Sequence, residues 1–195
     1  MHVDGLEAPL RWVREGRAER IDGGLVLTAG PRTDLFVDPR SDEVVATAPA
    51  LVGPVTPPFT VRARIAADLR ETFDAAALLV LGPDDRTWAK LAVERAPDGA
   101  TTIVTVVTRG VSDDCNHMTI EPIACWLRVT GLGDDVFALH TSGDGRTWDL
   151  VRYARLAGAS VVGLSVQSPL GSGSTARFDH VRWDRTMIAD IRDGT

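Results

Sequence analysis

Three side chains suited to binding a polar ligand share one face of the stretch 88–94, Trp-Ala-Lys-Leu-Ala-Val-Glu. Trp88, Lys90 and Glu94 alternate with apolar residues, and a period of two predicts a β-strand with one face in a core. The other face then presents an indole, an ammonium group and a carboxylate. An aromatic platform beside hydrogen-bonding groups suits the apolar face and the hydroxyl groups of a sugar.

Further polar side chains alternate with apolar residues in three later stretches. Trp126 and Arg128 alternate with apolar residues in one stretch, and His140 alternates with apolar residues in the next. Gln167 shares a face with small residues, including Gly163, which would leave room for a ligand. We therefore expect all four polar side chains to point away from the core.

The segment 112–117, Ser-Asp-Asp-Cys-Asn-His, has the residue types of a metal site, but not the spacing of one. Adjacent residues rarely converge on one ion, and the segment lacks the ligand pattern of a known calcium loop. We predict no metal ion and no cofactor. The segment is predicted to be a loop in which Asp113 or Asp114 caps main-chain amides or pairs with Arg109 or Arg128.

Catalysis on a glycan would require a second carboxyl group close to Glu94. Glycoside hydrolases place two carboxyl groups about 5–5.5 Å apart for retention or about 6.5–9.5 Å apart for inversion. Asp113 and Asp114 are the candidate partners, but no Glu-x-Asp-x-Glu row lies on one strand. The sequence also has no Gly-x-Ser-x-Gly between a strand and a helix, and no phosphate-binding loop. A hydrolase is therefore an alternative to a binding protein, and whether the chain is an enzyme stays open, with non-enzymatic binding preferred.

The elements that must position these side chains are about ten short strands. Glycine- and aspartate-rich turns separate them, and no strong amphipathic helix lies between them, which favours an antiparallel double sheet. The segment 31–58 is predicted to be a loop that wraps the sandwich, with Phe36 and Leu51 in the core. The expected strands lie near 12–13, 25–27, 59–65, 75–81, 88–94, 103–109, 125–130, 136–142, 149–153, 161–168 and 177–183.

Composition limits the classes of function. The 195 residues are 44% hydrophobic and 25% charged, with a formal net charge of −6, which fits one globular domain over 1–195 with a tail at about 186–195. The negative charge disfavours nucleic-acid binding, because no basic run is present. No apolar stretch is long enough to span a membrane, and the N-terminus lacks a signal-peptide core. We predict a cytoplasmic protein.

Cysteine usage agrees with a reducing compartment. Cys115 and Cys125 are too few for a disulfide scaffold. A bridge between them is sterically possible, but we predict two free thiols, with Cys125 as a small buried residue.

Six motifs together resemble one family. The chain is similar to the regulation-of-enolase-like proteins, a family of concanavalin A-like sandwiches, over nearly its whole length. The resemblance implies a curved two-sheet jelly roll of the legume-lectin and glucanase type, in which the concave face of one sheet is the usual binding groove. The motifs are TDLFVDP (33–39), WAKLAVE (88–94), VVTRGVSDD (106–114), WLRV (126–129), SGDGRTW (142–148) and VGLSVQSPLGSG (162–173).

The resemblance leads to one site prediction and three hypotheses of function. The first hypothesis is a binding module for a carbohydrate or a similar polar small molecule. The second is a glycan hydrolase that uses Glu94 with Asp113 or Asp114, and the third is a protein-interaction module that regulates metabolism and has a protein partner. Fold alone does not choose among them. The predicted groove holds Trp88, Lys90, Glu94, Trp126, Arg128, His140 and Gln167.

Overall fold

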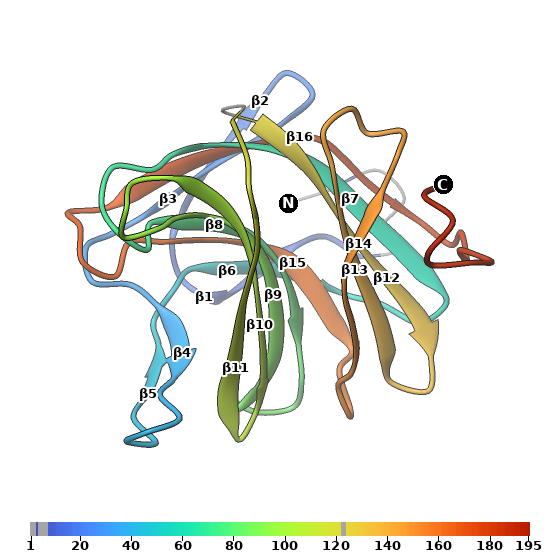
Figure 1. Ribbon diagram of the computed structural model, residues 1–195, viewed down its shortest axis with the longest axis horizontal. Helices are drawn as coiled ribbons and strands as arrows, with labels where there is room; N and C mark the ends of the chain where they lie inside the picture. Colours follow the sequence, from blue (N-terminus) through green and yellow to red (C-terminus); the bar gives the residue numbers. More distant parts are fainter. Residues whose placement is uncertain (1–2, 4–7, 122–123) are drawn as a thin grey trace.

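Two antiparallel sheets of seven strands each form the body of the protein (Figure 1). The computed structural model describes residue 3 and the ranges 8–121 and 124–195. It confirms the all-β, antiparallel sandwich, and the strands expected at 59–65, 75–81, 88–94 and 103–109 are all present.

The first sheet, sheet A, has the strand order β1-β6-β15-β8-β9-β10-β11. The second, sheet B, has the order β14-β13-β12-β7-β16-β3-β2. In sheet A the strands are β1 (Arg11–Arg14), β6 (Ala50–Pro54), β8 (Ala75–Leu81), β9 (Thr87–Arg95), β10 (Thr101–Arg109), β11 (Val111–Thr119) and β15 (Val161–Gln167). In sheet B they are β2 (Arg17–Ile21), β3 (Gly24–Ala29), β7 (Phe59–Asp68), β12 (Ala124–Gly133), β13 (Val136–Ser142), β14 (Asp149–Arg155) and β16 (Ser174–Asp184).

The main core lies between the sheets and contains an alternating set of apolar side chains from most of the long strands. Ala89, Leu91 and Val93 of β9 meet Leu127 and Val129 of β12 in one cluster of buried side chains. Removing this apolar surface from water is the main stabilising contribution to such a sandwich. The alternation leaves each sheet an outer face, and the two outer faces lie on opposite sides of the molecule.

A small hairpin covers part of the outer face of sheet A. It consists of β4 (Leu35–Val37) and β5 (Val44–Ala46), and Figure 1 shows it at the lower left, on the side of β11. The amide of Val37 donates to Ser112 Oγ on β11 at 2.9 Å. Thr33, just before β4, exchanges two main-chain hydrogen bonds of 3.1 Å with Ser168, just after β15. The hairpin is therefore attached to sheet A at both sides.

Two segments predicted as loops contain strands. The segment 31–58 includes β4, β5 and β6, and its Leu51 is in the core as expected, whereas Phe36 is half-buried outside the core. The charged segment after Arg109 is β11, which pairs with β10 from Arg109↔Val111 to Thr102↔Thr119. β11 is an exposed edge strand, so its side chains carry no apolar pattern, and pairing with β10 outweighs its low strand propensity.

Both cysteines are free, as expected: Cys115 is exposed on β11 and Cys125 is buried in β12. Burial raises the pKa of the Cys125 thiol to about 12, which disfavours thiolate chemistry there. No helix in the part of the chain that the structure describes is long and apolar enough to cross a membrane.

Candidate functional site

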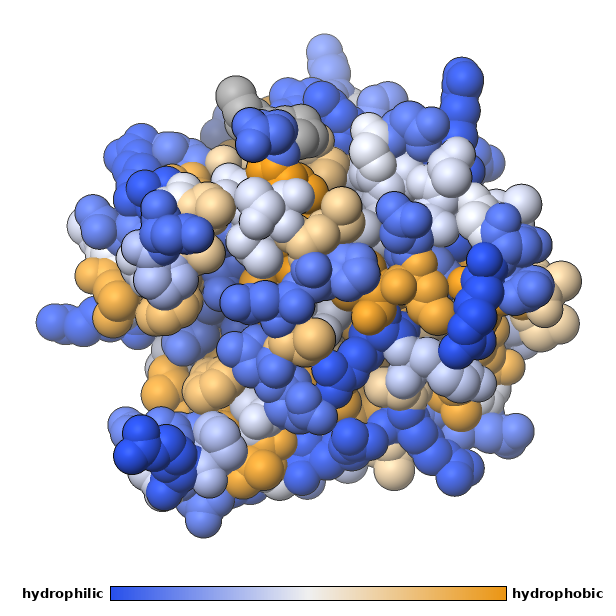
Figure 2. Space-filling view, in the orientation of Figure 1, coloured by the Kyte–Doolittle hydropathy of each residue, from blue (hydrophilic) through white to orange (hydrophobic). Residues whose placement is uncertain are grey.

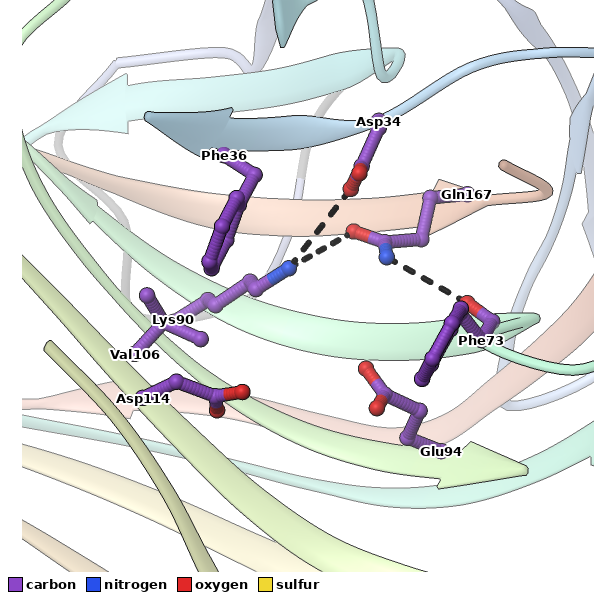
Figure 3. Close-up of a pocket in the computed structure, with 8 residues that line it drawn as sticks. All are labelled: Asp34, Phe36, Phe73, Lys90, Glu94, Val106, Asp114 and Gln167. Atoms are coloured by element: carbon purple, nitrogen blue, oxygen red, sulfur yellow. Dashed lines mark hydrogen bonds and ion pairs between the residues drawn. The ribbon is translucent and has the colours of Figure 1, made fainter. Parts of the chain in front are cut away.

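A pocket of about 170 Å³ lies on the outer face of sheet A, between the strands, the β4–β5 hairpin and the loop before β8 (Figure 3). The sheet supplies the floor, and two phenyl rings from outside the sheet form part of the wall. The lining residues are Asp34, Phe36, Phe73, Lys90, Glu94, Val106, Asp114 and Gln167.

Lys90 is the cation at the centre of the pocket. Alternation along β9 sends its side chain to the outer face, where the residue is only 3% exposed. Lys90 Nζ donates to Gln167 Oε1 at 3.0 Å and lies 3.8 Å from Asp34 Oδ1. Gln167 Nε2 in turn donates to the main-chain oxygen of Phe73 at 3.3 Å. Figure 3 shows these contacts as one chain across the pocket.

Three carboxylates surround this ammonium group. Asp34 precedes β4, while Glu94 and Asp114 point into the pocket from β9 and β11 (Figure 3). Lys90, Val106 and Asp114 form one cross-strand row, because Val106 pairs with Lys90 on one side and with Asp114 on the other. A single buried cation thus faces more negative charge than it neutralises, which favours a ligand rich in hydrogen-bond donors.

Glu94 is a pocket residue with a raised pKa. Burial raises its pKa to about 7, the charge of Lys90 lowers it, and the charges of Asp114 and Asp34 raise it. A carboxyl group with this pKa can be protonated or ionised at neutral pH, as a hydrogen-bond donor or as a general acid or base.

The raised pKa makes stability depend on pH. Because folded Glu94 holds its proton above the usual value of 4.5, the folded state binds more protons than the unfolded state between about pH 4.5 and 7. Stability from this group therefore falls as pH rises through that window, by about 2–3 kcal/mol. We expect Glu94→Gln to be more stable than the wild type by this amount at pH 8 but not at pH 4.5. Urea unfolding at both pH values measures the difference, and two parallel pH profiles would contradict it.

The loop before β8 is built around a buried carboxylate. Asp74 is fully buried; its Oδ2 accepts from the amides of Arg70 and Glu71 at 3.1 and 3.0 Å, and its Oδ1 accepts from Ser168 Oγ at 2.6 Å. These bonds hold the adjacent Phe73 at a φ of 68°, a left-handed conformation that is rare for a bulky residue. The Phe73 side chain remains 40% exposed and lines the pocket. Such local strain often occurs at functional sites.

The structure brings together three of the seven residues predicted to share a groove. Lys90, Glu94 and Gln167 line the pocket, and so does Asp114, one of the two predicted partners of Glu94. Asp113 points elsewhere and pairs with Arg152 at 2.8 Å, in place of the predicted partners Arg109 and Arg128. Among the described residues, no three His, Cys, Asp or Glu side chains are placed to hold a metal ion.

Trp88 lies on the predicted face but is not open to a ligand. The β4–β5 hairpin covers it, so that Trp88 is 1% exposed and packs with Leu35 and Val37 in a second apolar cluster. The expected room at Gly163 is also filled, because a Cβ there would lie 2.2 Å from the main-chain oxygen of Leu51 on β6.

Trp126, Arg128 and His140 lie on the other outer face, on strands β12 and β13 of sheet B. The chain after β16 runs back over Arg128 and His140. Arg128 Nη1 donates to the main-chain oxygen of Thr195 at 2.7 Å, and His140 Nε2 lies 2.9 Å from that of Ile191. The prediction that these three residues share a groove with Lys90 was wrong. Alternation shows which side chains of a strand point away from the core, but not which sheet the strand joins.

The sequence reasoning missed Asp34, Phe36 and Phe73. Asp34 and Phe36 belong to the motif TDLFVDP, which carried the family resemblance, and that motif was the available signal. Phe36 lines the pocket and does not lie in the core, where the sequence predicted it. No pattern marked Phe73, whose position depends on the buried Asp74.

The two packed antiparallel sheets define the protein as a β-sandwich with a polar pocket on one outer face. The chain belongs to the DUF1349 family, described as a protein of unknown function, whose model matches residues 12–186. No curated protein matches the chain.

Solved structures extend the comparison at the level of the fold. A functionally unknown protein from Saccharomyces cerevisiae is 23% identical with a TM-score of 0.83, over 92% of this chain and 98% of that one. The GH43 protein BlXynB from Bacillus licheniformis is 15% identical with a TM-score of 0.67, over 84% of this chain but only 33% of that one. A legume lectin-like domain from Entamoeba histolytica is 10% identical with a TM-score of 0.61, over 92% and 91% of the two chains.

Proposed function

We propose that this protein binds a carbohydrate, or a polar small molecule of similar chemistry, in the pocket on the outer face of sheet A. The observation that supports this most strongly is the buried pair of Lys90 and Gln167 at 3.0 Å, placed among three carboxylates and beside two phenyl rings. Carboxylates accept hydrogen bonds from hydroxyl groups, an amide can both donate and accept, and a phenyl ring packs on the apolar face of a sugar.

The structure changes which aromatic rings would stack. Phe36 and Phe73 take the role that the sequence had suggested for Trp88 and Trp126, since they are the aromatic residues of the pocket. The pocket volume of about 170 Å³ is below the range of about 300–1,000 Å³ that holds a drug-sized ligand. A single sugar unit, or the end of a chain, is therefore the ligand size that we propose.

Thermal-shift measurements against mono- and oligosaccharides test the proposal. A ligand at about 100 times its Kd stabilises the native state by about 2.7 kcal/mol, which corresponds to roughly 5–10 °C for a chain of this size. We expect Phe73→Ala to reduce this shift by at least half, because the exposed ring supplies a contact to the ligand. Tyr153→Ala is the matched control, because Tyr153 is also an exposed aromatic residue but lies on β14. Equal shifts in the two variants would contradict the role of Phe73.

A second candidate is hydrolysis of a glycan, favoured by the pKa of about 7 for Glu94. Glu94 would act as the acid and Asp114 as its partner, since both line the pocket and Asp113 does not. Under this alternative Glu94→Gln and Asp114→Asn would remove turnover of a sugar that both variants still bind. Binding by the wild type without turnover would leave the binding module as the function.

The third candidate, a protein-interaction module that regulates metabolism, derives from the resemblance to the regulation-of-enolase-like proteins. It predicts one contiguous exposed apolar patch. On the face shown in Figure 2, hydrophobic residues form several separate patches among hydrophilic ones. The exposed large apolar side chains are also spread over β1, β5, β11, β14 and several loops, so no observation favours this candidate over the pocket.

A further inference from the structure

The outer face of sheet B carries arginines in a row across three neighbouring strands. Arg62 on β7 pairs in register with Arg128 on β12 and with Arg182 on β16. Like charges directly opposite one another on paired strands destabilise a sheet. Three arginines in a row, in a chain with a net charge of −6, therefore need a partner that offsets their repulsion, or they serve a function.

Only one of these arginines has protein partners among the residues that the structure describes. Arg128 donates to Thr195 and lies 4.3 Å from the centre of the Trp148 ring. Burial, and then the charge of Arg62, lower its pKa to about 10. Arg62 and Arg182 have no hydrogen bond or ion pair with any described residue.

Asp179, next to His180 on β16, is an acidic side chain that other arginines already engage. The carboxylate of Asp179 accepts from Arg64 Nη1 at 3.2 Å and from Arg177 Nε at 2.9 Å, both on Oδ2. Arg62 and Arg182 are thus left as free donors on the same face, and guanidinium groups are the donors that best match the geometry of phosphate and sulfate oxygens.

These two arginines line a cleft of about 320 Å³, whose other lining residues are Trp126, His180 and Val181. The indole of Trp126 and the imidazole of His180 lie with their ring centres 5.4 Å apart. The cleft therefore places an aromatic surface beside two free cations, an arrangement that suits a ring joined to an anionic group.

A β-bulge makes this arrangement. The pairing of β16 with β7 changes register between Asp179 and Arg182, and His180 takes a left-handed φ of 50°. The amide of His180 donates to the main-chain oxygen of Gly23 at 3.0 Å, which holds the bulge in place. Bulges commonly re-aim side chains beside functional sites, and this one turns His180 toward Trp126.

We propose that the cleft formed by Arg62, Arg182, Trp126 and His180 is a second binding site, specific for a phosphate or sulfate group attached to a ring. The two guanidinium groups bind the anion and the indole packs on the ring. This site is separate from the pocket around Lys90, so either can be present without the other.

Isothermal titration at low ionic strength with phenyl phosphate and with inorganic phosphate tests the site. We expect the wild type to bind phenyl phosphate more tightly than inorganic phosphate. Arg62→Gln and Arg182→Gln should each weaken phenyl phosphate binding about tenfold or more, the effect of losing hydrogen bonds to a charged group. Arg146→Gln, which removes an exposed arginine outside the cleft, should bind as the wild type does.

Thermal unfolding of the two variants shows whether they remain folded. Because Arg62 and Arg182 repel their neighbours and have no described partner, both substitutions should leave the midpoint of thermal unfolding unchanged or raise it. The proposal is overturned if the wild type binds neither probe, if binding survives in both variants, or if Arg146→Gln loses as much affinity as they do. Equal affinity for the two probes would overturn the role of Trp126.

Discussion

Replacing Lys90 with methionine is expected to lower the free energy of unfolding by about 2–4 kcal/mol at pH 8 and to abolish ligand binding. Lys90 is buried, so its removal leaves Gln167 Oε1 without its 3.0 Å donor and leaves Glu94 and Asp34 without the charge that offsets theirs. Methionine is unbranched and only one atom shorter than lysine, so the loss would be mainly electrostatic and not a cavity effect.

The pH dependence distinguishes this cause from a general loss of packing. At pH 5 Glu94 is already protonated in the folded protein, because its pKa is about 7, so the loss in Lys90→Met should be smaller there than at pH 8. In the double variant with Glu94→Gln part of the stability at pH 8 should return, since neighbouring groups in one network are not additive. Urea unfolding of the four proteins at both pH values measures this. A loss that is equal at the two pH values would show that Lys90 does not neutralise Glu94.

Replacing Asp74 with alanine is expected to lower the free energy of unfolding by about 3 kcal/mol. It should also weaken ligand binding, although Asp74 does not itself line the pocket. The substitution removes the acceptor of two partly buried amides and of the buried Ser168 Oγ. Without those bonds the loop loses contacts that help to hold Phe73 at a φ of 68°, so we expect its ring to shift out of the pocket.

Glu71→Ala is the control, because Glu71 is exposed on the same loop and its side chain makes no hydrogen bond to a described residue. It should change stability by less than about 0.5 kcal/mol, as surface substitutions do, and should bind ligand as the wild type does. Chemical denaturation gives the stability, and titration of the folded variants gives the affinity. If Asp74→Ala bound ligand with wild-type affinity, the loop would have no part in the site.

Alternation in the sequence correctly predicted most of the long strands and their inner faces, but not the composition of the site. Lys90 and Glu94 could be placed together because they lie on one strand, and a strand fixes the face of each residue. Trp126 and Arg128 also point outward, but toward the other side of the sandwich. Their sheet follows from the pairing of β12 with β7 in sheet B, a long-range choice that no local pattern shows.

The loop residues of the pocket depend even more on tertiary structure. Phe73 reaches the pocket because Asp74 bonds to Ser168, which lies 94 positions away in the sequence. Asp34 lies close to Lys90 because the preceding residue, Thr33, exchanges main-chain hydrogen bonds with Ser168 at the end of β15. The strand β11 was not predicted because its exposed polar residues show no alternation, and only its pairing with β10 makes it a strand.

Mapping of the ligand site by NMR tests the central claim most directly. A ¹⁵N-labelled sample would be titrated with the sugar that gives the largest thermal shift, while the main-chain amide signals are followed. The pocket predicts that the largest changes occur at Asp34, Phe73, Lys90, Glu94, Asp114 and Gln167, and that they are lost in Lys90→Met. Changes centred on β12 and β13, or no change with any sugar of the panel, would contradict it.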